Sequence, residues 1–200
     1  MNHLRLLIAA LLFAAGPVLS GPLEDGVDAA LRQDYATAVR LWRPLAEAGH
    51  AYAQYNLGYM YRTGRGGLPQ DDKQALFWYL QAAAQGEPES QNALGIMYEK
   101  GEGVPQDNTK SISWYRKAAD QGFTSAQYWL GDIYERGRLV PKNDQKSYFW
   151  FLLASVSKTD YSDYWSKLAV EGRDRVDPRL TPQQRAAAQA DARNWKPTKK

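Results

Sequence analysis

Side chains able to carry metal, nucleophilic or acid–base chemistry are scarce in this sequence. The 200 residues include no cysteine and two histidines, His3 and His50. His3 belongs to an N-terminal segment that we expect to be removed, and one remaining histidine cannot build a multi-histidine metal site. Without cysteine there is no thiolate ligand or nucleophile. The sequence therefore predicts no metal, no cofactor and no catalytic set built on these residue types.

Serine and carboxylate side chains give only weak indications of catalysis. Ser111 and Ser113 have no evident partner base, and related segments of the chain place alanine, serine or phenylalanine at the same positions. Asp132 and Glu135 could do acid–base work, but we expect charged pairs on a helix surface to be solvated. The glycine-rich residues 64–69 lack the Gly-Lys-Ser/Thr ending of a phosphate loop and any preceding strand. We expect no catalytic residues, and an enzyme acting on the cell wall is the least favoured function.

One residue pattern occurs three times along the chain. The dipeptide Leu-Gly starts at Leu57, Leu94 and Leu130, so it recurs after 37 and then 36 residues. The loop prolines and the following tryptophans recur every 36 residues, at Pro69, Pro105 and Pro141 and at Trp78, Trp114 and Trp150. A period of this length, with two helical patterns in each copy, indicates a solenoid of helical hairpins.

Each copy contains two helices whose ends can be placed. The first helix carries Leu-Gly and ends at a glycine that suits a left-handed C-terminal cap, at Gly64, Gly101 or Gly137. The second helix follows a good N-cap residue, at Asp71, Asp107 or Asn143. Glycine inside a helix costs about 1 kcal/mol relative to alanine, so the glycine of Leu-Gly needs a packing role. We expect it to let the first helix approach the second closely, beside the large tryptophan of the second helix.

Residues 90–122 carry the most complete copy of the pattern, SQNALGIMYEKGEGVPQDNTKSISWYRKAADQG. This stretch follows A-x-x-x-L-G-x-x-Y-x-x-G-x-G-V, then D-x-x-K-A, then W-Y-x-x-A-A-x-x-G. The chain here resembles the Sel1-like repeat family, whose members are related to tetratricopeptide repeats but have a slightly longer unit. The resemblance implies an all-α fold, a right-handed α-solenoid of Sel1-like helix–turn–helix repeats with C-terminal capping helices.

The resemblance also suggests how the chain is divided. We expect a signal peptide at 1–20, an N-terminal partial repeat at 21–49, Sel1-like repeats at 50–86, 87–122 and 123–158, and C-terminal capping helices with a basic tail at 159–200. In the partial repeat, residues 34–49 resemble the second helix of a hairpin. Residues 180–197 resemble the terminal helix that often closes such arrays in bacterial members.

A partner-binding surface is expected on the first helix of each repeat. Positions i, i+4 and i+7 share one helical face, and this face varies between the copies while the framework positions recur. In related solenoids these helices line the concave surface, and tyrosine and arginine are favoured at interaction hot spots. The alternative is that the tyrosines are partly buried between helices. The predicted partner-binding residues are Tyr55, Tyr59, Arg62, Asn92, Ile96, Glu99, Tyr128, Asp132 and Glu135.

The first 20 residues have the features of a secretory signal peptide. Arg5 precedes an apolar run of 14 residues, and small side chains precede a cleavage site before Gly21. The run is shorter than the ~20 residues needed to span a bilayer, so we expect no stable membrane insertion after cleavage. Export of a helical repeat protein with polar surfaces indicates the periplasm.

The partner is expected to be another protein. Lysine and arginine outnumber aspartate and glutamate by 25 to 22, and the two signs are interleaved, so no basic stripe for nucleic acid is present. The favoured function is a non-enzymatic periplasmic interaction module, an adaptor or regulator that binds through the concave face of the repeats. The alternative is a periplasmic immunity protein that neutralises a toxic effector such as a phospholipase, as some small secreted members of the family do. The partner would then be an envelope component or a toxic effector.

Overall fold

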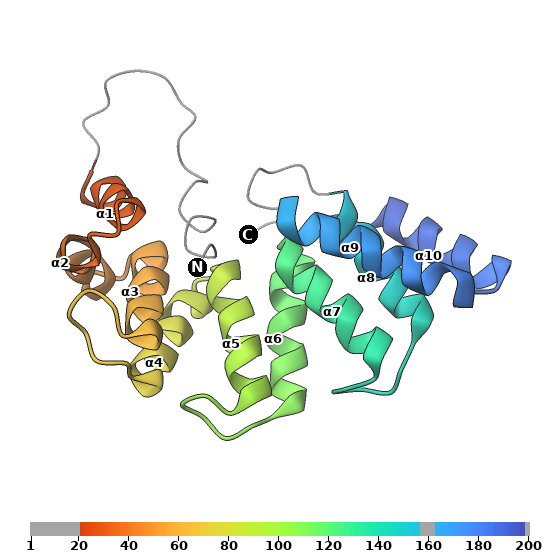
Figure 1. The fold of residues 1–200 in the computed structure, drawn as a ribbon, viewed down its shortest axis with the longest axis horizontal. Coiled ribbons are helices and arrows are strands. Elements are labelled where there is room, and N and C mark those ends of the chain that lie inside the picture. The colour runs from red at the N-terminus through yellow and green to blue at the C-terminus, as the bar shows by residue number, and fades with distance from the viewer. Residues whose placement is uncertain (1–20, 157–162, 199–200) are drawn as a thin grey trace, which may run out of the picture. The chain divides into compact units, whose positions relative to one another are not determined.

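The computed structural model describes residues 21–156 and 163–198 (Figure 1). Within these ranges the regular structure is helical and contains no strand, which confirms the predicted all-α solenoid of helical hairpins. No helix in the described ranges is long and apolar enough to cross a bilayer. The predicted signal peptide at 1–20 lies outside the described residues. The described residues form two compact units, the first from 21–90 with 100–106, and the second from 91–99 with 107–156 and 163–198.

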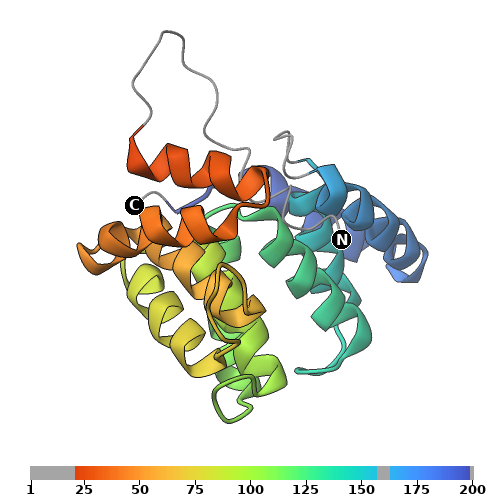
Figure 2. The same cartoon turned by 60° about the vertical axis from the view of Figure 1, so that its left-hand side comes forward.

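The first unit consists of consecutive antiparallel hairpins (Figure 2). Helix α1 packs on α2, α2 on α3, and α3 on α4. Trp42, Leu57 and Met60 are almost fully buried in their shared core. The helices of this unit are α1 (Pro22–Leu31), α2 (Tyr35–Glu47), α3 (Ala51–Thr63) and α4 (Asp72–Ala84). The unit also contains the first residues of α5 (Pro88–Lys100).

The second unit contains most of α5 and the remaining helices. Helix α7 packs on α6 and α8, and α8 in turn contacts both α9 and α10. The terminal helix α10 begins with a capping box between Thr181 and Gln184 and matches the closing helix expected from the sequence. The remaining helices of this unit are α6 (Asn108–Asp120), α7 (Thr124–Arg136), α8 (Asp144–Ser155), α9 (Asp163–Val176), the short 3-10 helix η2 (Asp177–Arg179) and α10 (Pro182–Asn194).

The helix ends lie where the sequence predicts them. Helices α3, α5 and α7, the first helices of the three Leu-Gly copies, stop at a glycine in the left-handed region, with φ of 62°, 73° and 66° at Gly64, Gly101 and Gly137. The side chain of Asp107 accepts a hydrogen bond from the backbone N–H of Lys110 at 2.9 Å. The side chains of Asp71 and Asn143 cap α4 and α8 in the same way.

The glycine inside each first helix marks a close helix crossing, as expected, but the residue it faces is different. A Cβ atom on Gly95 would lie 2.7 Å from the Tyr115 ring, and one on Gly131 would lie 2.6 Å from the Phe151 ring. For the three Leu-Gly helices the expectation that tryptophan packs there was wrong, because the residue after each tryptophan (Tyr79, Tyr115 and Phe151) fills the crossing. One residue further along a helix points about 100° away, so Trp114 faces elsewhere. In the N-terminal hairpin, Gly26 of α1 does face a tryptophan, Trp42.

A buried glutamine in the first helix of each of the three Leu-Gly copies also recurs with the period. Gln54 donates to the carbonyl oxygen of Ala46 at 3.1 Å, and Gln127 donates to that of Ala119 at 3.1 Å. The equivalent Gln91 is buried as well. In the two described bonds, the amide joins the first helix of a repeat to the second helix of the preceding repeat. An unmade hydrogen bond at such a buried site would cost about 1–3 kcal/mol.

Candidate partner-binding surface

The predicted partner-binding residues of the first unit have three different environments on α3. Tyr55 is only 4% exposed, and its ring centroid lies 5.8 Å from that of Tyr79, so it is a core residue. Tyr59 is half-buried, and burial raises the pKa of its phenol. Arg62 donates to Glu102 in the loop after α5 at 2.7 Å. In this unit Tyr59 and Arg62 are therefore the predicted residues that keep some exposure.

On α5 the three predicted residues are partly exposed. The Oδ1 atom of Asn92 is buried and has no hydrogen-bond partner among the described residues. Ile96 packs at the edge of the core of the second unit. Glu99 accepts a hydrogen bond from the hydroxyl of Tyr115 at 2.9 Å and forms an ion pair with Arg138. Glu99 is thus held by its own unit on two sides.

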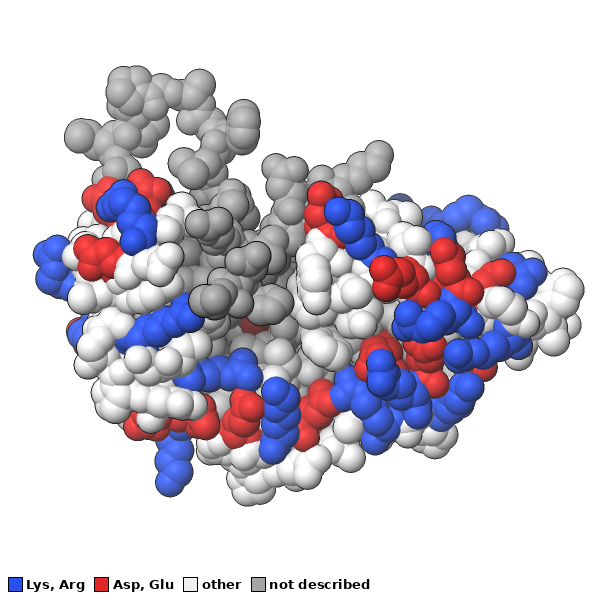
Figure 3. Space-filling view, viewed as in Figure 1, with Lys and Arg blue, Asp and Glu red and all other residues white. Residues whose placement is uncertain are grey.

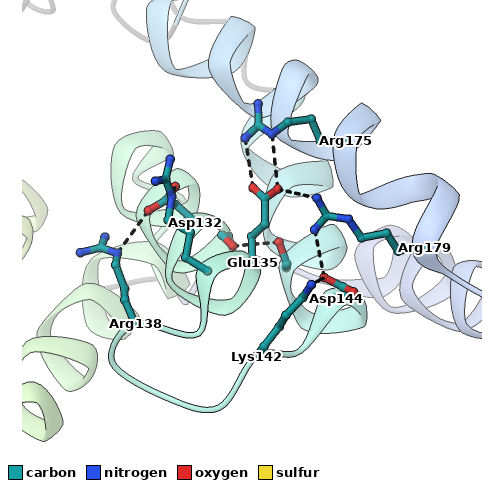
Figure 4. Close-up of polar contacts among 10 residues, drawn as sticks. Asp132, Glu135, Arg138, Lys142, Asp144, Arg175 and Arg179 are labelled. Carbon is teal, nitrogen blue, oxygen red and sulfur yellow. Dashed lines mark hydrogen bonds and ion pairs between the residues drawn. The ribbon is translucent and has the colours of Figure 1, made fainter.

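The two predicted carboxylates of α7 are buried, and both are paired with arginines (Figure 4). Asp132, 4% exposed, lies 2.6 Å from Nε of Arg136 and 3.2 Å from Nε of Arg138. Glu135, 9% exposed, lies 3.0 Å from Arg175 and 3.3 Å from Arg179.

These pairs connect α7 to the chain on either side of it. Arg138 follows α7, Arg175 belongs to α9, and Arg179 belongs to η2 and also lies 3.4 Å from Asp144 of α8. The expectation that Asp132 and Glu135 form a solvated surface pair was wrong, because both carboxylates are buried against guanidinium groups. Removing one partner of such a pair would leave a buried charge uncompensated.

One ion pair recurs at equivalent positions of the repeats with its charges exchanged. Arg62, Glu99 and Glu135 are spaced by 37 and 36 residues, and each lies near the end of a first helix. Arg62 pairs with Glu102 in the first unit, whereas in the second unit Glu99 pairs with Arg138, the residue 36 positions after Glu102. Glu135 continues the pattern with an arginine of α9. The position is therefore always charged and paired, but its sign changes.

Four aromatic side chains of the second unit form a cluster that we call the aromatic patch: Tyr128 and Trp129 of α7 with Tyr164 and Trp165 of α9. The Trp165 ring centroid lies 5.3 Å from Tyr128, 5.6 Å from Trp129 and 5.1 Å from Tyr164. Tyr164 is 43% exposed, and the other three rings are partly exposed. The patch includes one predicted residue, Tyr128, and three that the sequence analysis missed.

Arginines border the aromatic patch, and their charges are matched. The guanidinium of Arg138 lies 5.6 Å from the ring centroid of Trp129 while pairing with Glu99 and Asp132. On the face drawn in Figure 3, blue and red side chains alternate over the part of the surface formed by the second unit. The guanidinium that the structure places over the patch is therefore matched by carboxylates.

The described residues offer little for catalysis or metal binding. No group of three or more histidine, aspartate or glutamate side chains in the described ranges could hold a metal ion. His50 is exposed at the N-cap of α3 and makes no capping hydrogen bond. The hydroxyl of Ser111 donates to the carbonyl oxygen of Gly95 at 2.8 Å, which is a packing role.

Consecutive helical hairpins with an exposed aromatic and arginine surface define a helical-repeat scaffold of the kind that presents binding surfaces. The Sel1 repeat model matches residues 21–50, 51–87, 88–123 and 124–155, so the chain belongs to the Sel1 repeat family. The first match coincides with α1 and α2, so the N-terminal hairpin is itself a repeat. The sequence analysis had assigned only its second helix.

The curated proteins that are similar in sequence match only part of this chain. A component of an ERAD-associated E3 ubiquitin-protein ligase from Arabidopsis thaliana, HRD3A, is 43% identical over 58 residues, 29% of this chain and 9% of its own length. Chitin synthase regulatory factor 4 from Schizosaccharomyces pombe is 37% identical over 68 residues, 34% of this chain and 11% of its own length. The chain thus spans about a tenth of the curated relatives that it matches. Both names describe a component or a regulator, in keeping with the general role of Sel1 repeat proteins as protein–protein interaction adaptors.

Two solved structures have similar folds. A Sel1 repeat protein from Oxalobacter formigenes has a TM-score of 0.64 and 27% identity, over 84% of this chain and 54% of that one. A protective antigen of uropathogenic Escherichia coli that displays an SLR fold has a TM-score of 0.57 and 26% identity, over 86% of this chain and 43% of that one. These likenesses cover most of this chain but only about half of each structure.

Proposed function

We propose that the protein is a non-enzymatic adaptor that binds another protein through the aromatic patch, and that it does so in the periplasm. The observation that carries the binding proposal is the patch of Tyr128, Trp129, Tyr164 and Trp165, whose rings contact one another and remain partly open to solvent. Tyrosine, tryptophan and arginine are the residue types enriched at interaction hot spots.

The surroundings of the patch support protein binding rather than catalysis. The two carboxylates of α7 that follow Tyr128 and Trp129, Asp132 and Glu135, are both engaged by arginines. A rim of paired charges around an apolar centre matches the general anatomy of protein interfaces. Tyr59 and Arg62 of the first unit remain a predicted second contact surface.

The test compares partner capture by the original protein and by patch variants. Immobilised protein is incubated with envelope extract, the captured protein is identified by mass spectrometry, and its affinity is then measured in purified form. We expect Trp165→Ala to weaken binding by about thirtyfold, since truncating a hot-spot side chain costs about 2 kcal/mol or more. Tyr164→Ala is the milder variant, because this ring is already 43% exposed.

The matched control is Phe77→Ala on α4, which removes another exposed aromatic ring, 49% exposed, from outside the patch. Far-UV circular dichroism and the unfolding midpoint show whether each variant is folded. Folded patch variants that keep full affinity would contradict the proposal, as would loss of binding in Phe77→Ala alone.

The periplasmic location and the partner class are proposed from the sequence. The location is supported by the signal-peptide features of residues 1–20. One experiment distinguishes the two partner classes, an envelope component and a toxic effector. If the protein is an immunity protein, its expression rescues the growth of cells that export the captured partner, and Trp165→Ala removes the rescue. If the partner is an envelope component, the captured partner is not toxic when it is exported alone.

A further inference from the structure

A groove of about 530 Å³ lies between α6, α8 and α10 of the second unit. It shares no residue with the aromatic patch. Its volume falls within the about 300–1,000 Å³ that is typical of ligand sites. Phe149, Trp150 and Trp195 provide aromatic walls, and Arg116 and Lys146 provide positive charge. The groove is thus apolar with two cationic groups.

Both cations are held against aromatic rings. The guanidinium of Arg116 lies 4.7 Å from the ring centroid of Trp150, and the ammonium of Lys146 lies 5.4 Å from that of Tyr134. Such cation–π contacts hold the two side chains in position but leave their positive charges uncompensated. Neither side chain forms an ion pair with a carboxylate of the described residues. Burial raises the pKa of Asp120, one turn along α6 from Arg116, and the positive charge of Arg116 partly offsets this shift, although the two side chains do not form an ion pair.

The lining of the groove keeps an excess of positive charge. Arg116 and Lys146 contribute two positive charges, and Asp191 of α10 contributes one negative charge, which leaves +2 − 1 = +1. The arginines around α7 have carboxylate partners, as Figure 4 shows for Arg175 and Arg179. Arg116 differs from these arginines in having no carboxylate partner within ion-pair distance in the described part of the chain.

Arg116 is also a departure from the repeat framework. The residue 36 positions earlier, on α4, is Leu80. Packing of the second helix therefore does not require arginine at this position. A planar guanidinium whose donors are not used by a carboxylate is suited to bidentate recognition of a carboxylate from another molecule.

We propose that this groove binds an acidic peptide segment of a partner protein, in which an apolar side chain is flanked by carboxylates. The apolar side chain packs against Phe149 and Trp195, and the carboxylates accept hydrogen bonds from Arg116 and Lys146. The amide of Asn194, which also lines the groove, is available to the peptide backbone. This site is independent of the aromatic patch, so either proposal can fail while the other stands.

Isothermal titration of the purified protein tests the chemistry of the ligand. The probe is a capped peptide with one phenylalanine between aspartates, and its analogue carries asparagine in place of each aspartate. We expect the acidic peptide to bind at least about tenfold more tightly than the neutral one, because hydrogen bonds to charged groups are the stronger ones. Inorganic phosphate, which has charge but no apolar group, should not compete. The indole NMR signals of Trp150 and Trp195 should shift with the acidic peptide.

Two matched double variants test the position of the site. Arg116→Gln with Lys146→Gln should weaken binding of the acidic peptide by about tenfold or more. The control, Lys117→Gln with Lys110→Gln, removes the same charge from two cations that also lie over rings, at 4.0 Å from Trp114 and 5.4 Å from Tyr98, but outside the groove. Circular dichroism shows whether the variants are folded. If the double variant is unfolded, the single variant Lys146→Gln, which changes an exposed residue, is used in its place to measure the loss of peptide affinity.

Three results would overturn the proposal. One is the absence of binding of the acidic peptide at millimolar concentration. Another is equal binding of the neutral peptide, which would make the groove a purely apolar surface. The third is equal loss of affinity in both double variants, which would attribute binding to net charge at a distance. Loss of peptide binding in Trp165→Ala would show that the peptide uses the aromatic patch instead.

Discussion

Reversing the charges of Arg62 and Glu102 tests whether the recurring ion pair holds neighbouring repeats together. In the first unit Arg62 of α3 pairs with Glu102 at 2.7 Å, and the second unit has the opposite polarity in Glu99 and Arg138. Arg62→Glu with Glu102→Arg gives the first unit the polarity that the second already has. We expect each single reversal to destabilise the protein and the double reversal to recover most of the loss.

The expected size of the effect follows from the burial of the pair. Two unit charges 4 Å apart interact by about 1 kcal/mol in water and by about 4 kcal/mol at an effective dielectric constant of 20. The side chains of Arg62 and Glu102 are 23% and 29% exposed, so their surroundings lie between these limits. A coupling free energy of about 1–3 kcal/mol is therefore expected, within the range measured for directly interacting residues.

The assay is urea unfolding of the four proteins of the double-mutant cycle, followed by circular dichroism at low and high salt. Lys100→Ala is the control, because Lys100 also lies 3.6 Å from Glu102 but is 59% exposed. Its removal should change the free energy of unfolding by about 0.5 kcal/mol or less. A coupling energy within about 0.5 kcal/mol of zero, the limit within which independent sites add, would refute the reasoning. So would a double reversal that is no more stable than either single one.

Three further predictions concern stability and export. Gly95→Ala should lower the thermal midpoint by overpacking against Tyr115, at a cost of about 1–3 kcal/mol, whereas helix propensity alone predicts a gain of up to about 1 kcal/mol and a raised midpoint. The backbone N–H that α6 donates to Asp107 holds the pKa of that carboxyl below its usual range, so its contribution to stability is present above about pH 4 and is lost as the pH falls through the lowered pKa. Asp107→Asn copies the natural cap Asn143, so it should leave the thermal midpoint at neutral pH unchanged and reduce the fall of the midpoint at acid pH. Identical dependence of the midpoint on pH in the two proteins would contradict this prediction. Mass spectrometry of the exported protein should find an N-terminus near Gly21, and an intact N-terminus on cytoplasmic protein would disprove export.

Much of the fold could be predicted because the repeat copies the same local chemistry three times. Glycine caps, N-cap side chains and mid-helix glycines each have a backbone reason to be where they are. The partner of Gly95 could not be chosen in this way. Trp114 and Tyr115 are neighbours that recur with the same period, so spacing alone cannot tell which of them faces the glycine. Only the rotation of the helix decides that.

The candidate surface could be predicted only in part. The i, i+4, i+7 rule selected Tyr128 but not Trp129, because the next residue lies on another face of an isolated helix. Trp129 joins the patch through Trp165 of α9, a helix that lies outside the three Leu-Gly copies. The signal that could have found the patch is the Tyr-Trp dipeptide, which occurs at 128–129 and again at 164–165. The ion-pair partners of Glu135 were missed for the same reason, since Arg175 also belongs to α9.

The exchanged polarity of the recurring ion pair restricts how such a chain can change its length. Loss of one complete period would preserve the glycine caps, the glycine–aromatic crossings and the buried glutamines, since all of them recur in step. Loss of the period that lies between Arg62 and Arg138 would, however, bring Arg62 against the loop that carries Arg138 and set two positive charges together at a partly buried position. The repeats are therefore not interchangeable modules. Their charges restrict the order in which they can follow one another, and a recombined gene that lacks the period between Arg62 and Arg138 would encode a protein whose shortened junction repels itself.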